Sequence, residues 1–95
     1  MRVFVESFGT LNEKLDESGY LIEENSTLLQ LIEQINCSLD GDDFINALLT
    51  PDKSSLGPYV FATINDQNVY QLGGIDKMLK DGDEIFIIQA DMVGG

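Results

Sequence analysis

The residues with the clearest chemical potential are the last two of the chain, Gly94 and Gly95. Taking glycine at about 7% of residues, a chain ends in two glycines by chance only about 0.5% of the time. Because glycine lacks a Cβ, an extended Gly-Gly segment fits a narrow channel and presents its carboxylate to the active site of a partner. The Gly95 carboxylate is the predicted reactive group, and Met92, Val93 and Gly94 are predicted to thread into that channel.

A free terminal carboxylate is ionised at neutral pH and is a poor electrophile, so another molecule must activate it. The chain contains no histidine, which is the usual general base near neutral pH and the commonest neutral metal ligand. Its one cysteine, Cys37, has no histidine to activate it and is expected to pack as a small apolar residue at the end of a helix. We predict no catalytic residue, no metal site and no bound cofactor.

Two glycine-containing motifs have simpler explanations than ligand binding. Gly73-Gly74 is not followed by the Lys-Ser or Lys-Thr pair of a phosphate-binding loop and is predicted to end a strand. Asp40-Gly41-Asp42-Asp43 lacks the spaced oxygen ligands and the distal glutamate of a calcium-binding EF-hand loop. It is expected to be a turn and a helix cap.

Charge and composition exclude several classes of protein. The 95 residues include 17 acidic and 5 basic side chains, a formal net charge of -12, which repels nucleic-acid phosphates and anionic lipid headgroups. No segment approaches the run of about 18 apolar residues that a membrane span needs, and the first residues lack the apolar run of a signal peptide. We therefore expect a cytoplasmic protein that binds neither nucleic acid nor membranes. The acidic surface either has no specific partner or steers the chain toward a basic one.

The length and the order of elements predict one small α+β domain, residues 1–90, followed by a flexible tail, residues 91–95. The prolines and glycine of residues 50–58 predict a turn-rich loop. Alternation and turn residues predict strands at 2–8, 20–23, 59–64, 69–72 and 84–90, with Asn65-Asp66-Gln67-Asn68 as a turn, and helices from Thr27 and at 42–49.

The helix that begins at Thr27 has the strongest local signal. Thr27 and Gln30 form a Thr-x-x-Gln capping box, in which each side chain bonds the backbone N–H of the other residue. The following apolar residues recur at helical spacing and predict one buried stripe: Leu28, Leu31, Ile32 and Ile35. A second helix is predicted to begin at Asp42 or Asp43 and to face inward through Ile45, Leu48 and Leu49.

The last predicted strand is apolar on both faces. Ile85 and Ile87 point one way, whereas Phe86, Ile88 and Ala90 point the other way. One face is expected to meet the helix, and the second face is covered either by loops of the chain or by a docked partner. The candidate docking residues are Phe4, Phe61, Ile85 and Ile87.

Taken together, the motifs of the C-terminal third resemble those of the ubiquitin-like sulfur carriers. The resemblance is specific over residues 59–95 and collinear before them, and its family includes the molybdopterin-synthase small subunit, the thiamine sulfur carrier and archaeal ubiquitin-like modifiers. The family commonly has Asn-Gly where this chain has Asn65-Asp66, which leaves the turn type open. The motifs that carry the resemblance are Tyr59-Val60-Phe61-Ala62-Thr63-Ile64-Asn65, Leu72-Gly73-Gly74-Ile75-Asp76, Leu79-Lys80-Asp81-Gly82-Asp83-Glu84-Ile85 and the closing Gly94-Gly95.

The resemblance implies a β-grasp fold, with a mixed sheet of four to five strands covered on one face by a helix. It also implies that a ubiquitin-activating-type enzyme uses ATP to adenylate Gly95, which then becomes a thiocarboxylate. The implied role is a sulfur donor in molybdopterin biosynthesis, with the large catalytic subunit of molybdopterin synthase as second partner. The chain itself would be a cosubstrate and not an enzyme.

Four alternative roles compete with this one. A thiamine-pathway carrier and a protein modifier joined to lysines through Gly95 share the same tail chemistry and stay open. A plain interaction module with an incidental tail also stays open. An electron carrier of the plant-type ferredoxin class needs four cysteines and is excluded, since the chain has one.

Overall fold

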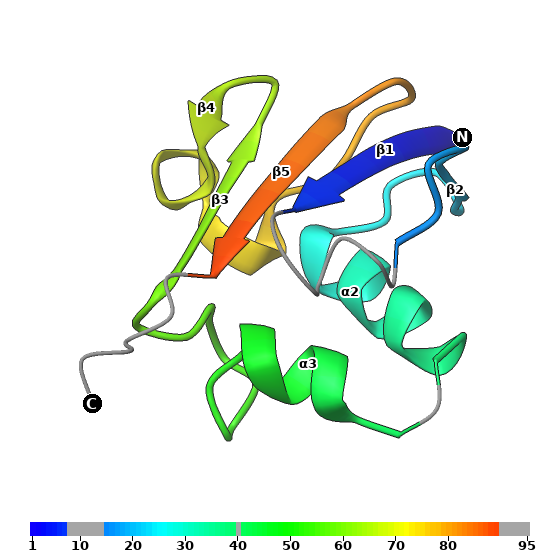
Figure 1. Ribbon diagram of the computed structural model, residues 1–95. Coiled ribbons are helices and arrows are strands. Elements are labelled where there is room, and N and C mark those ends of the chain that lie inside the picture. The colour runs from blue at the N-terminus through cyan, green and yellow to red at the C-terminus, as the bar shows by residue number, and fades with distance from the viewer. Residues whose placement is uncertain (8–14, 40, 90–95) are drawn as a thin grey trace.

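The centre of the sheet is formed by two strands from opposite ends of the sequence. The computed structural model describes residues 1–7, 15–39 and 41–89. Within them, the first strand lies parallel to the last, and every other strand pair is antiparallel, which makes the sheet mixed. In sheet order the five strands are β2 (Tyr20–Leu21), β1 (Arg2–Ser7), β5 (Glu84–Gln89), β3 (Val60–Ile64) and β4 (Gln67–Asn68) (Figure 1).

Two helices, α2 (Leu28–Cys37) and α3 (Asp43–Leu48), lie on the same side of this sheet (Figure 1). Two single-turn 3-10 helices, η1 (Val69–Leu72) and η2 (Gly74–Asp76), connect β4 to the turn before β5. The predicted α+β class and β-grasp architecture are confirmed. The predicted tail, residues 91–95, lies outside the described residues.

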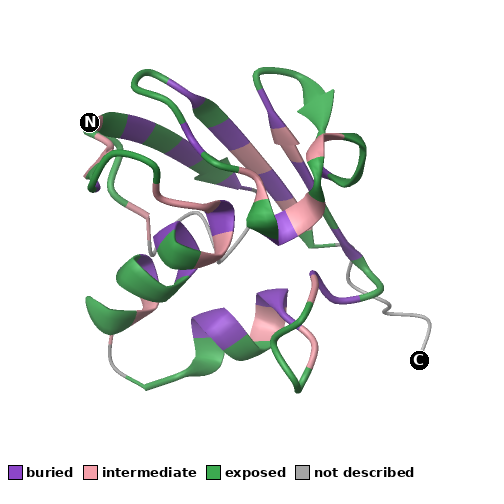
Figure 2. Cartoon of the chain, turned by 180° about the vertical axis from the view of Figure 1, so that it is seen from behind, coloured by how far each residue is buried: buried purple, intermediate pink, exposed green. Residues whose placement is uncertain are grey.

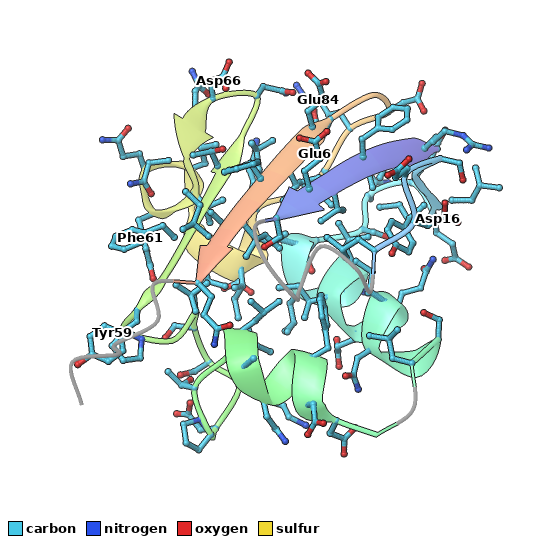
Figure 3. The ribbon with its side chains drawn as sticks, in the orientation of Figure 1. Glu6, Asp16, Tyr59, Phe61, Asp66 and Glu84 are labelled. Atoms are coloured by element: carbon cyan, nitrogen blue, oxygen red, sulfur yellow. The ribbon has the colours of Figure 1, made fainter. Side chains whose placement is uncertain are left out.

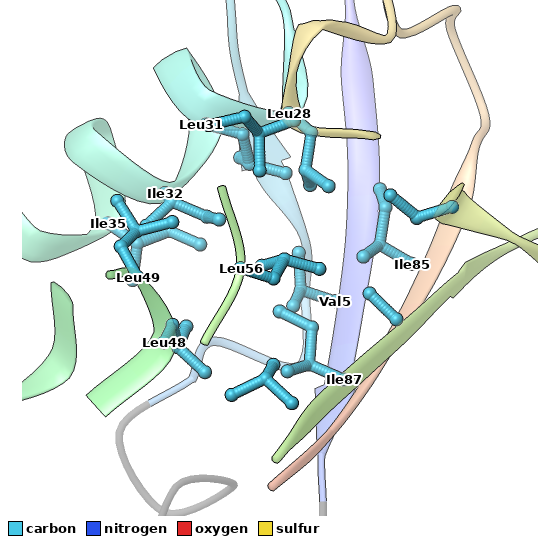
Figure 4. Packing of buried hydrophobic residues seen from close by; sticks show 14 of the residues in the cluster. Val5, Leu28, Leu31, Ile32, Ile35, Leu48, Leu49, Leu56, Ile85 and Ile87 are labelled. Carbon is cyan, nitrogen blue, oxygen red and sulfur yellow. The ribbon is translucent and has the colours of Figure 1, made fainter. Parts of the chain in front are cut away.

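Helix α2 begins as its sequence predicts. The Thr27 hydroxyl accepts the Gln30 N–H at 3.2 Å, and the Gln30 side chain accepts the Thr27 N–H at 2.8 Å. These two bonds satisfy N–H groups that the first turn of a helix leaves without partners. The predicted stripe is buried against the sheet (Figure 4): Leu28, Leu31, Ile32 and Ile35.

Helix α3 is capped by a residue from the end of α2. Asp42 is the N-cap, as predicted, but its side chain makes no capping bond to the helix. The Asn36 amide oxygen instead accepts the Ile45 N–H at 3.2 Å, and the Asn36 amide nitrogen donates to Asp42 at 3.0 Å. One amide side chain therefore joins the two helices and fixes the start of the second.

Buried residues alternate with more exposed ones along the strands (Figure 2). In β1 the inward residues are Val3, Val5 and Ser7. The hydroxyl of Ser7 donates to the Ile87 carbonyl at 2.6 Å, which gives this buried polar group a partner within the core.

The predicted return strand at 69–72 is wrong. The strand β4 occupies Gln67–Asn68, and the following residues form η1 because the Asn68 side chain accepts the Tyr70 N–H at 2.9 Å. The predicted four-residue turn is correspondingly shorter. Asn65 and Asp66 have φ of 52° and 70°, so both central residues are left-handed, as in the type I′ turn that suits a two-residue hairpin.

Candidate functional site

The predicted reactive segment of Met92, Val93, Gly94 and Gly95 lies outside the described residues. What the structure does define is the strand from which this segment continues. Strand β5 is the middle strand of the five, and its last residue, Gln89, pairs with Val60 of β3. The strand that precedes the predicted reactive segment in the sequence is therefore the central strand of the sheet.

The two faces of β5 meet different surroundings. Ile85 and Ile87 are each 2% exposed and point into the core under the helices. Phe86 and Ile88 are half-buried on the opposite face, which we call the open face. The prediction that Ile85 and Ile87 dock a partner is therefore wrong, because the chain's own helices already cover them.

Sequence reasoning missed Phe86 and Ile88 as the apolar residues on the open face. Both faces of the strand are apolar, so hydrophobicity alone could not separate them. A signal was present in Glu84, which is exposed and shares the parity of Phe86 and Ile88. Because residues two apart lie on one face of a strand, this glutamate marks the face that water reaches.

The other two docking candidates lie on the open face. Phe4 of β1 is 38% exposed and Phe61 of β3 is 51% exposed. Tyr59, one residue before β3, is 49% exposed. Docking at these residues stays a prediction, but their side chains are available to a partner.

Strand register divides the open face into two ends. Phe61 pairs with Ile88 near the end of β5, and we call Tyr59, Phe61 and Ile88 the tail end of the face. Phe4 pairs with Glu84 and Glu6 pairs with Phe86 near the start of β5, and we call these four residues the acidic end. Figure 3 shows Glu6 and Glu84 together at one end of the sheet, with Phe61 and Tyr59 toward the other.

A buried network fixes the backbone at the acidic end. Asp83 is 7% exposed, and its carboxylate accepts the Asn65 amide at 2.9 Å and the Lys80 N–H at 2.8 Å. The Asn65 amide oxygen accepts the Glu84 N–H at 3.0 Å. These bonds join the type I′ turn to the turn before β5 and so position Glu84. The sequence identified Asp83 only as part of the motif Leu79-Lys80-Asp81-Gly82-Asp83-Glu84-Ile85.

Two hollows of the surface lie at the acidic end. One, of about 450 Å³, extends toward β3 and includes Thr63 and Asp66 in its lining. The other, of about 540 Å³, extends toward the chain before β2 and includes Leu15 and Glu17. All four residues of the acidic end line both hollows.

Cys37 is exposed at the end of α2, so the prediction that it packs as an apolar residue is wrong. Within residues 1–7, 15–39 and 41–89, no three histidine, cysteine, aspartate or glutamate side chains are placed to hold a metal ion. In the same residues no helix has the length and apolarity that crossing a membrane requires.

Comparison with known proteins shows the family. A model of the ThiS family matches residues 5–95 of this chain. A search of curated proteins finds no significant match. The fold is shared with CysO of Mycobacterium tuberculosis, which is 23% identical with a TM-score of 0.74 over 93% of this chain and 98% of that one.

Two further solved structures have the same fold. A chain of the BexX/CysO complex of Amycolatopsis orientalis is 23% identical with a TM-score of 0.72, over 98% of this chain and 99% of that chain. Urm1 of Trypanosoma brucei is 20% identical with a TM-score of 0.75, over 99% and 95%. Because the family model spans nearly the whole sequence, this chain belongs to the ThiS family, the ubiquitin-like sulfur carriers that its sequence resembles.

Proposed function

We propose that this chain carries sulfur on the carboxylate of Gly95 and donates it in molybdopterin biosynthesis. The observation that carries the proposal is the ThiS family match, which extends through the terminal Gly94-Gly95 to residue 95. Strand β5, which leads into this segment, is held by both neighbours in the sheet, so the tail begins from a rigid support.

The proposed chemistry uses the chain as a substrate and not as a catalyst. A ubiquitin-activating-type enzyme binds ATP, and the Gly95 carboxylate attacks the α-phosphorus of this ATP. An O–P bond forms, pyrophosphate leaves, and Gly95 becomes an acyl adenylate.

Sulfide or an enzyme-bound persulfide then attacks the carbonyl carbon, so that a C–S bond forms as the C–O bond to AMP breaks. With hydrogen sulfide ion, loss of one proton leaves the thiocarboxylate directly. With a persulfide, the product is an acyl disulfide, and a thiol must reduce it to release the thiocarboxylate.

The segment between α2 and β3 favours molybdopterin synthesis among the sulfur pathways. It adds about 20 residues before Tyr59 and contains α3, and this length supports a carrier of the molybdopterin type. The large catalytic subunit of molybdopterin synthase is the proposed acceptor of the sulfur. The Amycolatopsis orientalis neighbour, a BexX/CysO complex, supports the view that a chain of this fold works while docked on a partner.

The test is the intact mass of the chain after incubation with ATP, an adenylating enzyme and a sulfur donor. We expect a gain equal to one oxygen-to-sulfur exchange, localised to Gly95. A variant lacking Gly95 should show no gain, and Gly94→Val should be a poor substrate because a β-branched side chain obstructs a narrow channel. Sulfur gain by the deletion variant would overturn the proposal.

Two further measurements separate the carrier from the protein modifier. Delivery of sulfur to a molybdopterin precursor by the thiocarboxylate form supports the proposed pathway. Lysine-linked adducts of Gly95 with other proteins, formed without a free thiocarboxylate, would support the modifier instead.

A further inference from the structure

The acidic end of the open face has an alternating arrangement of charge and aromatic rings. Along β1 the outward residues are Phe4 and then Glu6, whereas along β5 they are Glu84 and then Phe86. The parallel register pairs Phe4 with Glu84 and Glu6 with Phe86. Each glutamate therefore has a phenylalanine beside it on the neighbouring strand, and the two glutamates are diagonal neighbours.

This arrangement is hollowed and is acidic at its margins. The two surface hollows share all four of these residues, and each hollow adds a further carboxylate, Asp66 on one side and Glu17 on the other. Aromatic rings in a concave site provide flat apolar surfaces, and the carboxylates around them favour a cation.

The chain does not supply that cation from its described residues. It has 5 basic residues against 17 acidic ones. Arg2 lies on β1 near the acidic end, but its guanidinium donates to the Ser18 carbonyl. Within the part of the chain that the structure describes, no residue forms an ion pair or a side-chain hydrogen bond with the carboxylates of Glu6 or Glu84.

We propose that the acidic end binds an arginine side chain of the protein that activates the tail. The guanidinium lies between Glu6 and Glu84 and stacks on the ring of Phe86 or Phe4. The inference rests on the proposed function, since a carrier must dock on the enzyme that modifies its tail.

Arginine fits this site better than lysine for two geometric reasons. Its planar fork of five N–H donors can bond two carboxylates at once, whereas an ammonium group acts as a point charge. Its flat face also stacks on aromatic rings. A metal ion fits poorly, because no cluster of three metal-ligating side chains exists among the described residues.

The position of the site gives the arginine a specific task. Glu84 and Gln89 bound β5, so Glu84 at the acidic end lies about 17 Å from Gln89, the last residue of the strand, at a rise of about 3.3 Å per residue. Apolar contact at the tail end alone would leave the carrier free to rotate on its partner. A second contact at the acidic end fixes the direction in which the tail enters the active site.

The first experiment measures ATP–pyrophosphate exchange by the adenylating enzyme with the carrier as varied substrate. We expect the double variant E6Q/E84Q to raise KM by about tenfold with little change in kcat, since a charge contact outside the reacting group acts on binding. The matched control is E23Q/E24Q, which removes the same two charges from exposed positions outside both hollows. An equal rise of KM in both variants would overturn the proposal, because it would show that the loss of net charge, and not the position of the glutamates, weakens binding.

A second experiment needs no enzyme and therefore separates this inference from the proposed function. The isotope-labelled chain is titrated with N-acetyl-arginine amide, and the backbone amide shifts of Glu6, Glu84 and Phe86 are followed by NMR. We expect saturable shifts at these residues that N-acetyl-lysine amide does not reproduce and that E6Q/E84Q loses. Shifts spread evenly over other acidic segments, or equal shifts with the lysine amide, would overturn the arginine site.

The two experiments give different results depending on whether the carrier function or the arginine site is wrong. Absence of adenylation of the unmodified chain refutes the proposed function, whereas the arginine titration is unaffected by that result. Normal adenylation with an unchanged KM for E6Q/E84Q refutes the arginine site and leaves the carrier function intact. Thermal unfolding of each variant confirms that the substituted glutamates, which are exposed, leave the fold unchanged.

Discussion

The two faces of β5 have nearly the same composition and opposite roles. Ile85 and Ile87 are buried under α2 and α3, whereas Phe86 and Ile88 lie on the open face between exposed aromatic rings and carboxylates. The covered face contributes to the stability of the domain, and the open face is available for binding. Both faces carry large apolar side chains, so chemical type does not distinguish their roles. What decides the role of a side chain in this strand is whether it lies on the side of the sheet that the helices cover.

The largest expected effect on stability comes from truncating one side chain on each face of β5. Ile87→Ala should lower the free energy of unfolding by about 2–5 kcal/mol, because it leaves a cavity in a closed core. The matched variant Ile88→Ala should cost about 1 kcal/mol, since its side chain is half-exposed. Chemical denaturation measures both, and equal losses would show that the open face is packed as tightly as the core.

A smaller effect is expected from the polar network that supports the acidic end. Asp83→Ala removes the acceptor for the Asn65 amide and the Lys80 N–H and should cost about 1–3 kcal/mol. Glu84→Gln at the adjacent first residue of β5 keeps these bonds and should change stability by about 0.5 kcal/mol or less. If Asp83→Ala is as stable as the parent protein, the open face owes its shape to the strand pairing alone.

A substitution in the type I′ turn should raise the free energy of unfolding without changing the core. Asp66 has φ of 70°, a conformation that costs an L-residue free energy and costs glycine little. We expect Asp66→Gly to raise the free energy of unfolding by about 0.5–1 kcal/mol and Asp66→Ala to lower it, as measured by thermal unfolding. A destabilised glycine variant would contradict this assignment of backbone strain.

The smallest effect concerns the loop after α3, away from both faces. Hydrogen bonds from the Thr50 and Ser54 hydroxyls and the Ser54 N–H lower the pKa of Asp52 from its usual 3.8. A depressed folded-state pKa contributes stability above the unfolded value, and this contribution is lost as the pH falls through the folded value.

The difference in stability between the parent protein and Asp52→Asn should therefore be largest near neutral pH and should shrink as the pH falls below about 3.8. Thr50→Val, which removes the main donor to Asp52, should reduce the same difference. Thermal unfolding at several pH values measures it. A difference that grows in acid would have the wrong sign and would contradict the role of these hydrogen bonds.

Much of the fold was predictable because its signals are local. The capping box at Thr27 and the stripe of Leu28, Leu31, Ile32 and Ile35 predicted α2, and the three central strands were also predicted. The segment at 69–72 was misassigned because the Asn68 side chain bonds the Tyr70 N–H and starts a 3-10 turn. Strand propensity does not reveal that a side-chain hydrogen bond to the backbone competes with strand pairing.

The candidate site was predicted less completely. The tail was chosen from its terminal glycines, and Phe4 and Phe61 were correctly placed on an accessible surface. The choice of Ile85 and Ile87 over Phe86 and Ile88 failed because it depends on which face the helices cover. The pairing of Glu6 with Phe86 also depends on strand register, which long-range contacts set and a single sequence does not encode locally.

The placement of β5 has a consequence for how the chain is made. Of the strands that the structure describes, β5, which joins β1 to β3, is the last to be synthesised, and contacts of such long sequence separation form late. A chain that stops before β5 has two unpaired halves and no completed sheet, so it is exposed to aggregation and degradation. The described sheet can therefore close only after the residues of β5 have been synthesised.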